Sequence, residues 1–128
     1  MNYTRKAKVF SRLALKEKML LLQKIKSLKA VTTELDNMAK LTKKLRGLVE
    51  EEIKKGDLKN ASELKAHKFY SQKIHSELSQ ISNRKDFLEN EVVNIRLSAG
   101  KAKIKVNKAL DKSSWYEKLQ QVEVDRKA

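Results

Sequence analysis

The sequence contains no cysteine and no proline, and only three of its 128 residues are glycine. Without cysteine there can be no disulfide, thiolate zinc site or iron–sulfur cluster. An average chain of this length carries about six prolines and nine glycines, so their scarcity argues against sandwiches, barrels and α/β folds, which need many turns. Aromatic residues make up 5% of the chain, too little for a large globular core. These absences indicate a protein built from long helices.

Long apolar segments are also missing. The longest uninterrupted run is Met19–Leu22, far short of the roughly 20 residues that a membrane span needs. A secretory signal would need an apolar core near Val9, but Arg12 and Lys16 interrupt it. The first 29 residues are basic and poor in acids, like a mitochondrial transit peptide, yet they are rich in lysine rather than in arginine and serine. We therefore expect no membrane span, secretory signal or mitochondrial transit peptide.

One break divides the chain into two helical segments. Gly56 suits the position just after a helix end, where the backbone turns left-handed. Asn60, with Glu63 three residues later, matches a capping box that starts a helix. We predict an all-α, elongated antiparallel two-helix coiled-coil hairpin that forms one domain over residues 1–128. Its helices are expected at about 3–55 and about 61–123, with a turn at about 56–60.

The second predicted helix carries a regular contact stripe. Eleven positions alternate spacings of four and three residues, and all but Lys85 are apolar: Ile74, Leu78, Ile81, Lys85, Leu88, Val92, Ile95, Ala99, Ala102, Val106 and Ala109. This repeat is typical of the seam of a left-handed coiled coil. We expect the Lys85 ammonium to reach outward into water. Tyr116 continues the series, whereas Trp115 lies off it.

The first predicted helix is less regular. Its seam comprises two interleaved seven-residue series, Leu21, Leu28, Leu35, Thr42 and Val49 in one and Val31, Met38 and Leu45 in the other. Further leucines lie beside this seam and widen the apolar stripe: Leu13, Leu20, Leu41 and Leu48. A wide stripe predicts either a third packed helix or a face that binds another protein.

Positive charge is concentrated in two segments. The chain holds 30 Lys and Arg against 16 Asp and Glu, a net charge of +14. Residues 1–29 contribute nine bases and one acid, a net of +8, and residues 96–112 contribute six bases and one acid, a net of +5. A short turn makes the two helices antiparallel, so these segments should lie side by side. Either they form a solvated lysine-rich surface, or they form a basic end that meets an acidic protein or a nucleic acid.

Residues suited to catalysis are scarce. His67 and His75 lie eight residues apart, about 12 Å along a helix axis, which is too far to share a metal ion. The sequence has no glycine-rich phosphate loop and no nucleophile elbow. We expect a protein that is not an enzyme, without catalytic residues, bound cofactor or metal site.

Several short motifs lie along the chain: a basic start at residues 5–10, the aromatic pair Phe69-Tyr70, a stretch of arginine and hydrophobic residues at residues 83–89, and C-terminal segments at residues 105–112 and 116–119. Over about Arg5 to Leu119 these motifs resemble those of the FliJ/YscO family of flagellar and virulence type III export systems.

The resemblance implies a cytoplasmic stalk protein at the periphery of an inner-membrane export apparatus. Its end with both termini would insert into a hexameric export ATPase through Arg5, Lys8, Arg12, Lys101, Lys105 and Lys108. The cytosolic domain of the export gate would contact residues just after the turn: Phe69, Tyr70, Ile74 and Leu78. For Ile74 and Leu78, packing in the seam is the competing interpretation. The alternative function is a basic helical hairpin that binds nucleic acid without sequence specificity, because only charge supports such binding here.

Overall fold

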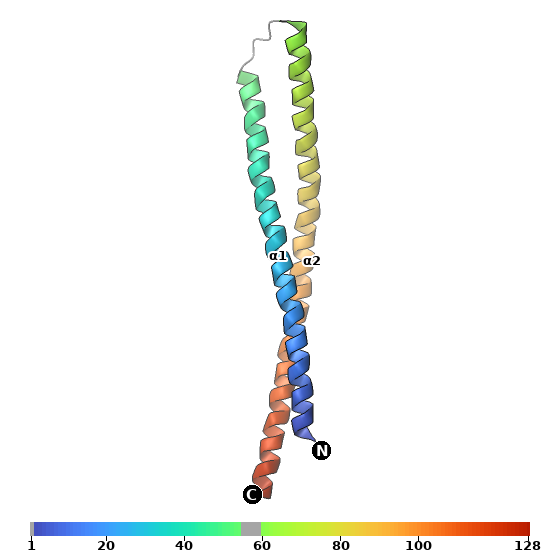
Figure 1. The fold of residues 1–128 in the computed structure, drawn as a ribbon, viewed down its shortest axis with the longest axis vertical. Coiled ribbons are helices and arrows are strands. Elements are labelled where there is room, and N and C mark those ends of the chain that lie inside the picture. The colour runs from blue at the N-terminus through green and yellow to red at the C-terminus, as the bar shows by residue number, and fades with distance from the viewer. Residues whose placement is uncertain (1, 55–59) are drawn as a thin grey trace. The chain divides into compact units, whose positions relative to one another are not determined.

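The protein is a hairpin of two helices. The computed structural model describes residues 2–54 and 60–128, and over them it contains α1 (Tyr3–Lys54), α2 (Ala61–Lys127) and no strand (Figure 1). The predicted all-α antiparallel hairpin is thus confirmed. Both helices begin at the predicted residue, but α2 continues to Lys127, four residues past the predicted end at Glu123. The expected helix end at Gly56 lies outside the described residues.

Asparagine caps the start of each helix. The Oδ1 atom of Asn2 accepts a hydrogen bond from the Arg5 amide at 3.1 Å, and that of Asn60 accepts one from the Glu63 amide at 2.8 Å. Each cap satisfies an amide that has no carbonyl partner within its helix, which stabilises a helix by about 1 kcal/mol. The sequence predicts the cap at Asn60, and the structure adds the one at Asn2.

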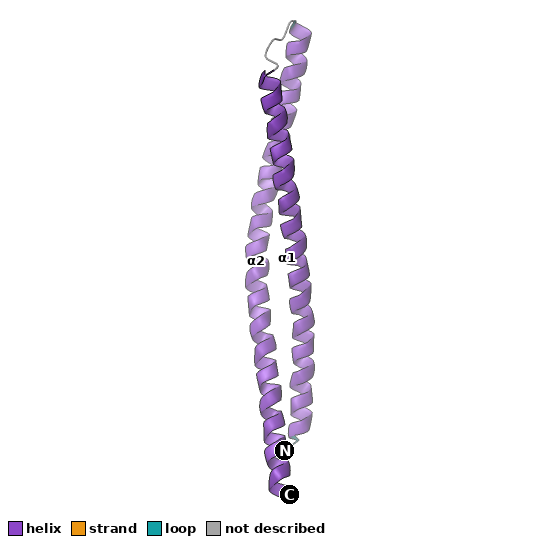
Figure 2. Ribbon diagram, turned by 90° about the vertical axis from the view of Figure 1, so that its left-hand side faces the viewer, coloured by secondary structure: helices purple, strands orange, loops and turns teal. Residues whose placement is uncertain are grey.

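Contacts between the helices fall into two units. Unit 1 comprises residues 1–29 and 93–128, and unit 2 comprises residues 30–92. Within each unit a segment of α1 and a segment of α2 run antiparallel and side by side in both views (Figures 1 and 2). Both chain termini therefore belong to unit 1.

Unit 2 has a seam of large apolar residues. Leu45 of α1 and Ile74, Leu88 and Val92 of α2 are buried, as the four-three spacing predicts. Lys85 is exposed and its ammonium lies 3.9 Å from the Glu89 carboxylate, so its predicted outward orientation is confirmed. Polar contacts link the two helices at the edges of this seam. The Arg84 guanidinium lies 3.3 Å from Glu34, and the His67 ring lies 3.1 Å from Glu52.

Unit 1 has a seam of small residues. Its buried positions are Ala7, Ala14, Ala102, Val106, Ala109 and Ser113. The distance between packed helices depends on the side chains at the contact, so alanine and serine favour a close approach of the two backbones. The Ser113 hydroxyl uses this proximity to donate a 3.0 Å hydrogen bond to the Ala7 carbonyl.

The seam of α1 is longer than the sequence analysis predicts. The four-three spacing extends back through Lys24, Leu21, Glu17, Ala14, Phe10, Ala7 and Tyr3, all of which are buried or half-buried. Lys24 donates a hydrogen bond across the seam to the Ser98 hydroxyl. By contrast, Leu13, Leu20, Leu41 and Leu48 stay exposed, so no third helix covers them within the described chain.

Candidate functional site

The most distinctive property of unit 1 is its charge. Unit 1 holds 18 Lys and Arg against five Asp and Glu, a net charge of +13, whereas unit 2 holds 12 against 11, a net charge of +1. Nearly all of the excess positive charge therefore belongs to the unit with both termini. Unit 1 is the candidate binding site for an acidic partner.

The six predicted basic residues form one row on each helix. Arg5, Lys8 and Arg12 follow one another at spacings of three and four along α1, and Lys101, Lys105 and Lys108 follow at spacings of four and three along α2. These spacings keep each row on one helix face. All six side chains are exposed, so both rows are accessible to a partner.

A shallow groove in unit 1 joins apolar and basic side chains. It has a volume of about 250 Å³ and is lined by Phe10, Leu13, Glu17, Lys105, Lys108, Ala109 and Lys112. The Lys112 ammonium lies 5.3 Å from the centre of the Phe10 ring, a cation–π distance. An apolar floor beside three lysines suits a partner that offers both a hydrophobic side chain and carboxylates.

Other predicted basic residues line different grooves of unit 1. Arg12 lines a groove of about 310 Å³ with Lys18, Val106 and Leu110. Lys8 lines another, of about 270 Å³, in which Glu117 supplies a negative charge. The structure therefore brings Lys105 and Lys108 to one groove and distributes Lys8 and Arg12 over others.

Lys112 belongs to the candidate site, although the sequence analysis leaves it out. It lies four residues after Lys108 and so extends the basic row of α2 by one turn. That spacing is readable from the sequence. Its position beside Phe10 depends on the pairing register of the helices, which the sequence alone does not fix.

An aromatic cluster holds the two terminal segments of unit 1 together. The Tyr116 ring stacks on Phe10 with ring centres 5.6 Å apart and on Tyr3 at 6.3 Å, and Trp115 meets its edge at 4.9 Å. The Lys6 ammonium lies 5.5 Å from the Tyr116 ring. The predicted packing role of Tyr116 is confirmed, and Trp115, which lies off the seam, is 55% exposed.

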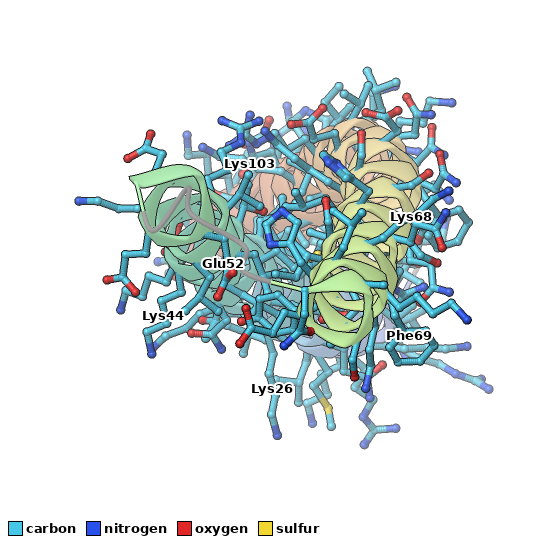
Figure 3. The ribbon with its side chains drawn as sticks, turned by 90° about the horizontal axis from the view of Figure 1, so that it is seen from above. Lys26, Lys44, Glu52, Lys68, Phe69 and Lys103 are labelled. Carbon is cyan, nitrogen blue, oxygen red and sulfur yellow. The ribbon has the colours of Figure 1, made fainter. Side chains whose placement is uncertain are left out.

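The four gate-facing candidates in unit 2 differ in accessibility. Phe69 is 70% exposed and Tyr70 is also exposed, whereas Ile74 is only 4% exposed and Leu78 is half-buried. Figure 3 shows Phe69 projecting away from α1, beside Lys68. Phe69 and Tyr70 can therefore meet a partner, while Ile74 and Leu78 are occupied by packing against α1.

Metal-binding clusters and membrane-spanning stretches are absent from the part of the chain that the structure describes. No group of three or more histidine, aspartate and glutamate side chains is arranged to hold a metal ion there. Over the same residues, neither helix has a stretch long and apolar enough to cross a membrane.

Comparisons with known proteins give no further assignment. The chain matches no family model, no curated protein and no solved structure. The charge, grooves and exposed aromatic side chains of the two units are therefore the basis for a functional proposal.

Proposed function

We propose that the protein is a stalk or adaptor of a flagellar or type III secretion export apparatus. Unit 1 would insert into a hexameric export ATPase, and unit 2 would contact the cytosolic domain of the export gate. The observation that carries this proposal is the charge of the two units, +13 in unit 1 and +1 in unit 2. The resemblance of the sequence to the FliJ/YscO family supplies the identity of the partners.

Electrostatics supports a partner with complementary charge. Like charges crowded on one unit repel one another and destabilise it, and an acidic surface would relieve that repulsion. The exposed rows of Arg5, Lys8 and Arg12 and of Lys101, Lys105 and Lys108 are placed for such a surface. The groove beside Phe10 and Leu13 adds apolar contact area.

A different chemistry supports the gate contact. Among the residues that the structure describes, Phe69 is the most exposed of the large hydrophobic side chains, and the exposed Tyr70 follows it in the sequence. Exposed aromatic residues are frequent anchors of protein interfaces, because they bury a large area at a low entropic cost. The gate contact is therefore assigned to Phe69 and Tyr70, on a unit that is almost neutral overall.

The test of the ATPase contact is a matched pair of charge reversals. The double variant Arg12→Glu/Lys105→Glu should weaken binding to the purified export ATPase and reduce its stimulation of ATP hydrolysis. The control Lys43→Glu/Lys73→Glu changes the net charge equally, but both lysines are exposed residues of unit 2. The control should leave binding and stimulation unchanged.

Two outcomes would contradict the proposal. Equal losses from both double variants would mean that only the overall charge matters and that unit 1 has no special role. Tight binding to duplex DNA or RNA, with an association constant that falls steeply as salt rises, would support the nucleic-acid alternative instead.

A further inference from the structure

A second surface of unit 1 is left unexplained by the basic rows. Five large apolar side chains of α2 project into solvent: Val93, Leu97, Ile104, Trp115 and Val122, each at least half exposed. At 3.6 residues per turn they fall within about 40° of one another around the helix. They lie opposite the buried seam of Ala102, Val106 and Ala109. We call these five residues the outer stripe.

Basic residues accompany the outer stripe along its length. Lys101, Lys108 and Lys118 fall within about 60° of its centre, by the same helix geometry, and all are exposed. Asp111 is the one acid in this sector between Val93 and Val122. Apart from Asp111, which lies among the stripe residues between Ile104 and Trp115, the surface is therefore apolar along its middle and has lysines at its edges. An occupant must offer hydrocarbon and negative charge together.

The spacing of the outer stripe bears on what that occupant is. A partner helix in a groove is held by anchors at intervals of three, four and seven residues. The intervals along the outer stripe are four, seven, eleven and seven residues. Three of them match that pattern, but the eleven-residue interval from Ile104 to Trp115 leaves about 16 Å of the helix without an apolar anchor, at 1.5 Å per residue. A continuous apolar medium tolerates such an interruption better than a facing row of side chains does.

Two other occupants fit this surface less well. Nucleic acid would pair with the lysines but leaves Val93, Leu97 and Ile104 in water, since phosphates and sugars do not bury aliphatic side chains. A second copy of the chain could cover the apolar side chains, but it would bring another unit of charge +13 against the first, which is electrostatically unfavourable.

We propose that the outer stripe of α2 binds the surface of a bilayer that contains anionic lipids. Trp115 and the four aliphatic side chains enter the boundary between headgroups and acyl chains, and the flanking lysines contact lipid phosphates. Basic helices with one apolar face bind membranes in this way, in the plane of the interface. Lys101 and Lys108 also belong to the basic row of α2, but the five apolar residues of the outer stripe do not, and the proposal does not depend on the export ATPase.

The single tryptophan makes the proposal directly testable. Vesicles of phosphatidylcholine with about a third phosphatidylglycerol carry the negative charge that the lysines beside the outer stripe would bind. On mixing with the full-length protein, Trp115 emission should shift to shorter wavelength. Lipids brominated near the carbonyl end of their acyl chains should quench it. Vesicles of phosphatidylcholine alone should bind at least ten times more weakly.

A matched pair of variants locates the contact. Leu97→Asn/Ile104→Asn changes two exposed residues of the outer stripe, and we expect it to lower the partition coefficient on anionic vesicles at least tenfold. Leu15→Asn/Met19→Asn makes the same kind of change at exposed positions of α1 in unit 1. This control should bind like the unmodified protein. Circular dichroism verifies that both variants remain helical.

Several results would overturn the proposal. One is an unshifted, unquenched Trp115 in the presence of anionic vesicles. Another is equal weakening by the two double variants, which would mean that any exposed leucine contributes. A third is binding that about 0.5 M salt abolishes in full with no spectral shift beforehand, since screening at that strength removes purely electrostatic attraction. Binding to the hexameric export ATPase can still be measured with Leu97→Asn/Ile104→Asn. Failure of the membrane proposal is therefore distinguishable from failure of the ATPase proposal.

Discussion

Small side chains in the seam give unit 1 a tight but weakly hydrophobic contact. Alanine buries little apolar surface, so each of Ala7, Ala14, Ala102 and Ala109 contributes less than a leucine would. What this seam gains is proximity of the two backbones, which Ser113 exploits in its hydrogen bond to the Ala7 carbonyl. The volume of position 113 should therefore matter more than its hydroxyl group.

A substitution series at Ser113 tests this expectation. Ser113→Ala removes one hydrogen bond and should cost about 0.5–1.5 kcal/mol of unfolding free energy. Ser113→Leu places a large side chain between close helices and should cost more, because overpacking adds about 1–3 kcal/mol of strain. Urea unfolding followed by circular dichroism measures both. The control Ser114→Leu changes the exposed neighbour and should be nearly neutral. If Ser113→Leu were stabilising, the helices would not be close at this position.

Individual residues also show where sequence reasoning reaches its limit. Glu17 and Lys24 occupy seam positions of α1, but a charged residue in a seam does not stand out in an apolar pattern. Lys24 is accommodated because Ser98, a small polar residue across the seam, accepts its hydrogen bond. That pairing depends on the register between the helices. The apolar positions of the α1 seam could therefore be predicted from Leu21 onward, but the charged positions Glu17 and Lys24 could not.

At the scale of helices, boundaries follow from capping chemistry more than from apolar periodicity. The start of α2 is predictable because the Asn60 side chain can accept a hydrogen bond from the Glu63 amide. The end of α2 is not, since no glycine or proline follows Glu123 and nothing local stops the helix before Lys127. Asn2 also caps α1, but this cap is not among the features predicted from the sequence.

The seam of unit 2 should hold its two helical segments together mainly by burial of large side chains. Leu88 is 3% exposed, so Leu88→Ala should lower the unfolding free energy by about 2–5 kcal/mol through lost burial and a cavity. Leu41→Ala removes the same atoms from an exposed position of the same unit. It should cost about 1 kcal/mol or less, because fewer of its atoms leave water on folding. Similar costs for the two variants in urea unfolding would contradict the seam.

For the whole molecule, the division of charge is the feature that the sequence predicts best. Counting bases and acids locates the excess in residues 1–29 and 96–112, and the hairpin brings both segments into unit 1. The grooves and the aromatic cluster could not be predicted, because they depend on which residue of α1 faces which residue of α2. Phe10 and Tyr116 are 106 positions apart, yet their rings stack.

This division of charge predicts that salt acts differently on the two units. In unit 1 the 18 bases far outnumber the five acids, and the net repulsion among the bases opposes folding. In unit 2 the positive and negative charges nearly balance. Raising sodium chloride from about 0.01 M to about 0.5 M shortens the screening length from about 30 Å to less than 10 Å. Amide hydrogen exchange should therefore slow across unit 1 and change little in unit 2.

A charge-reversal variant separates repulsion from other effects of salt. Lys16 and Lys26 are exposed residues of unit 1, outside both basic rows and the outer stripe. Lys16→Glu/Lys26→Glu lowers the net charge of the unit by four, so it should slow exchange in unit 1 at low salt and make that exchange less sensitive to added salt. Faster exchange in unit 1 at high salt, or equal slowing in both units, would show that repulsion within unit 1 is not what limits its stability. If the prediction holds, any acidic partner of unit 1 stabilises the fold on which its own binding depends, because it neutralises the same charges that salt screens.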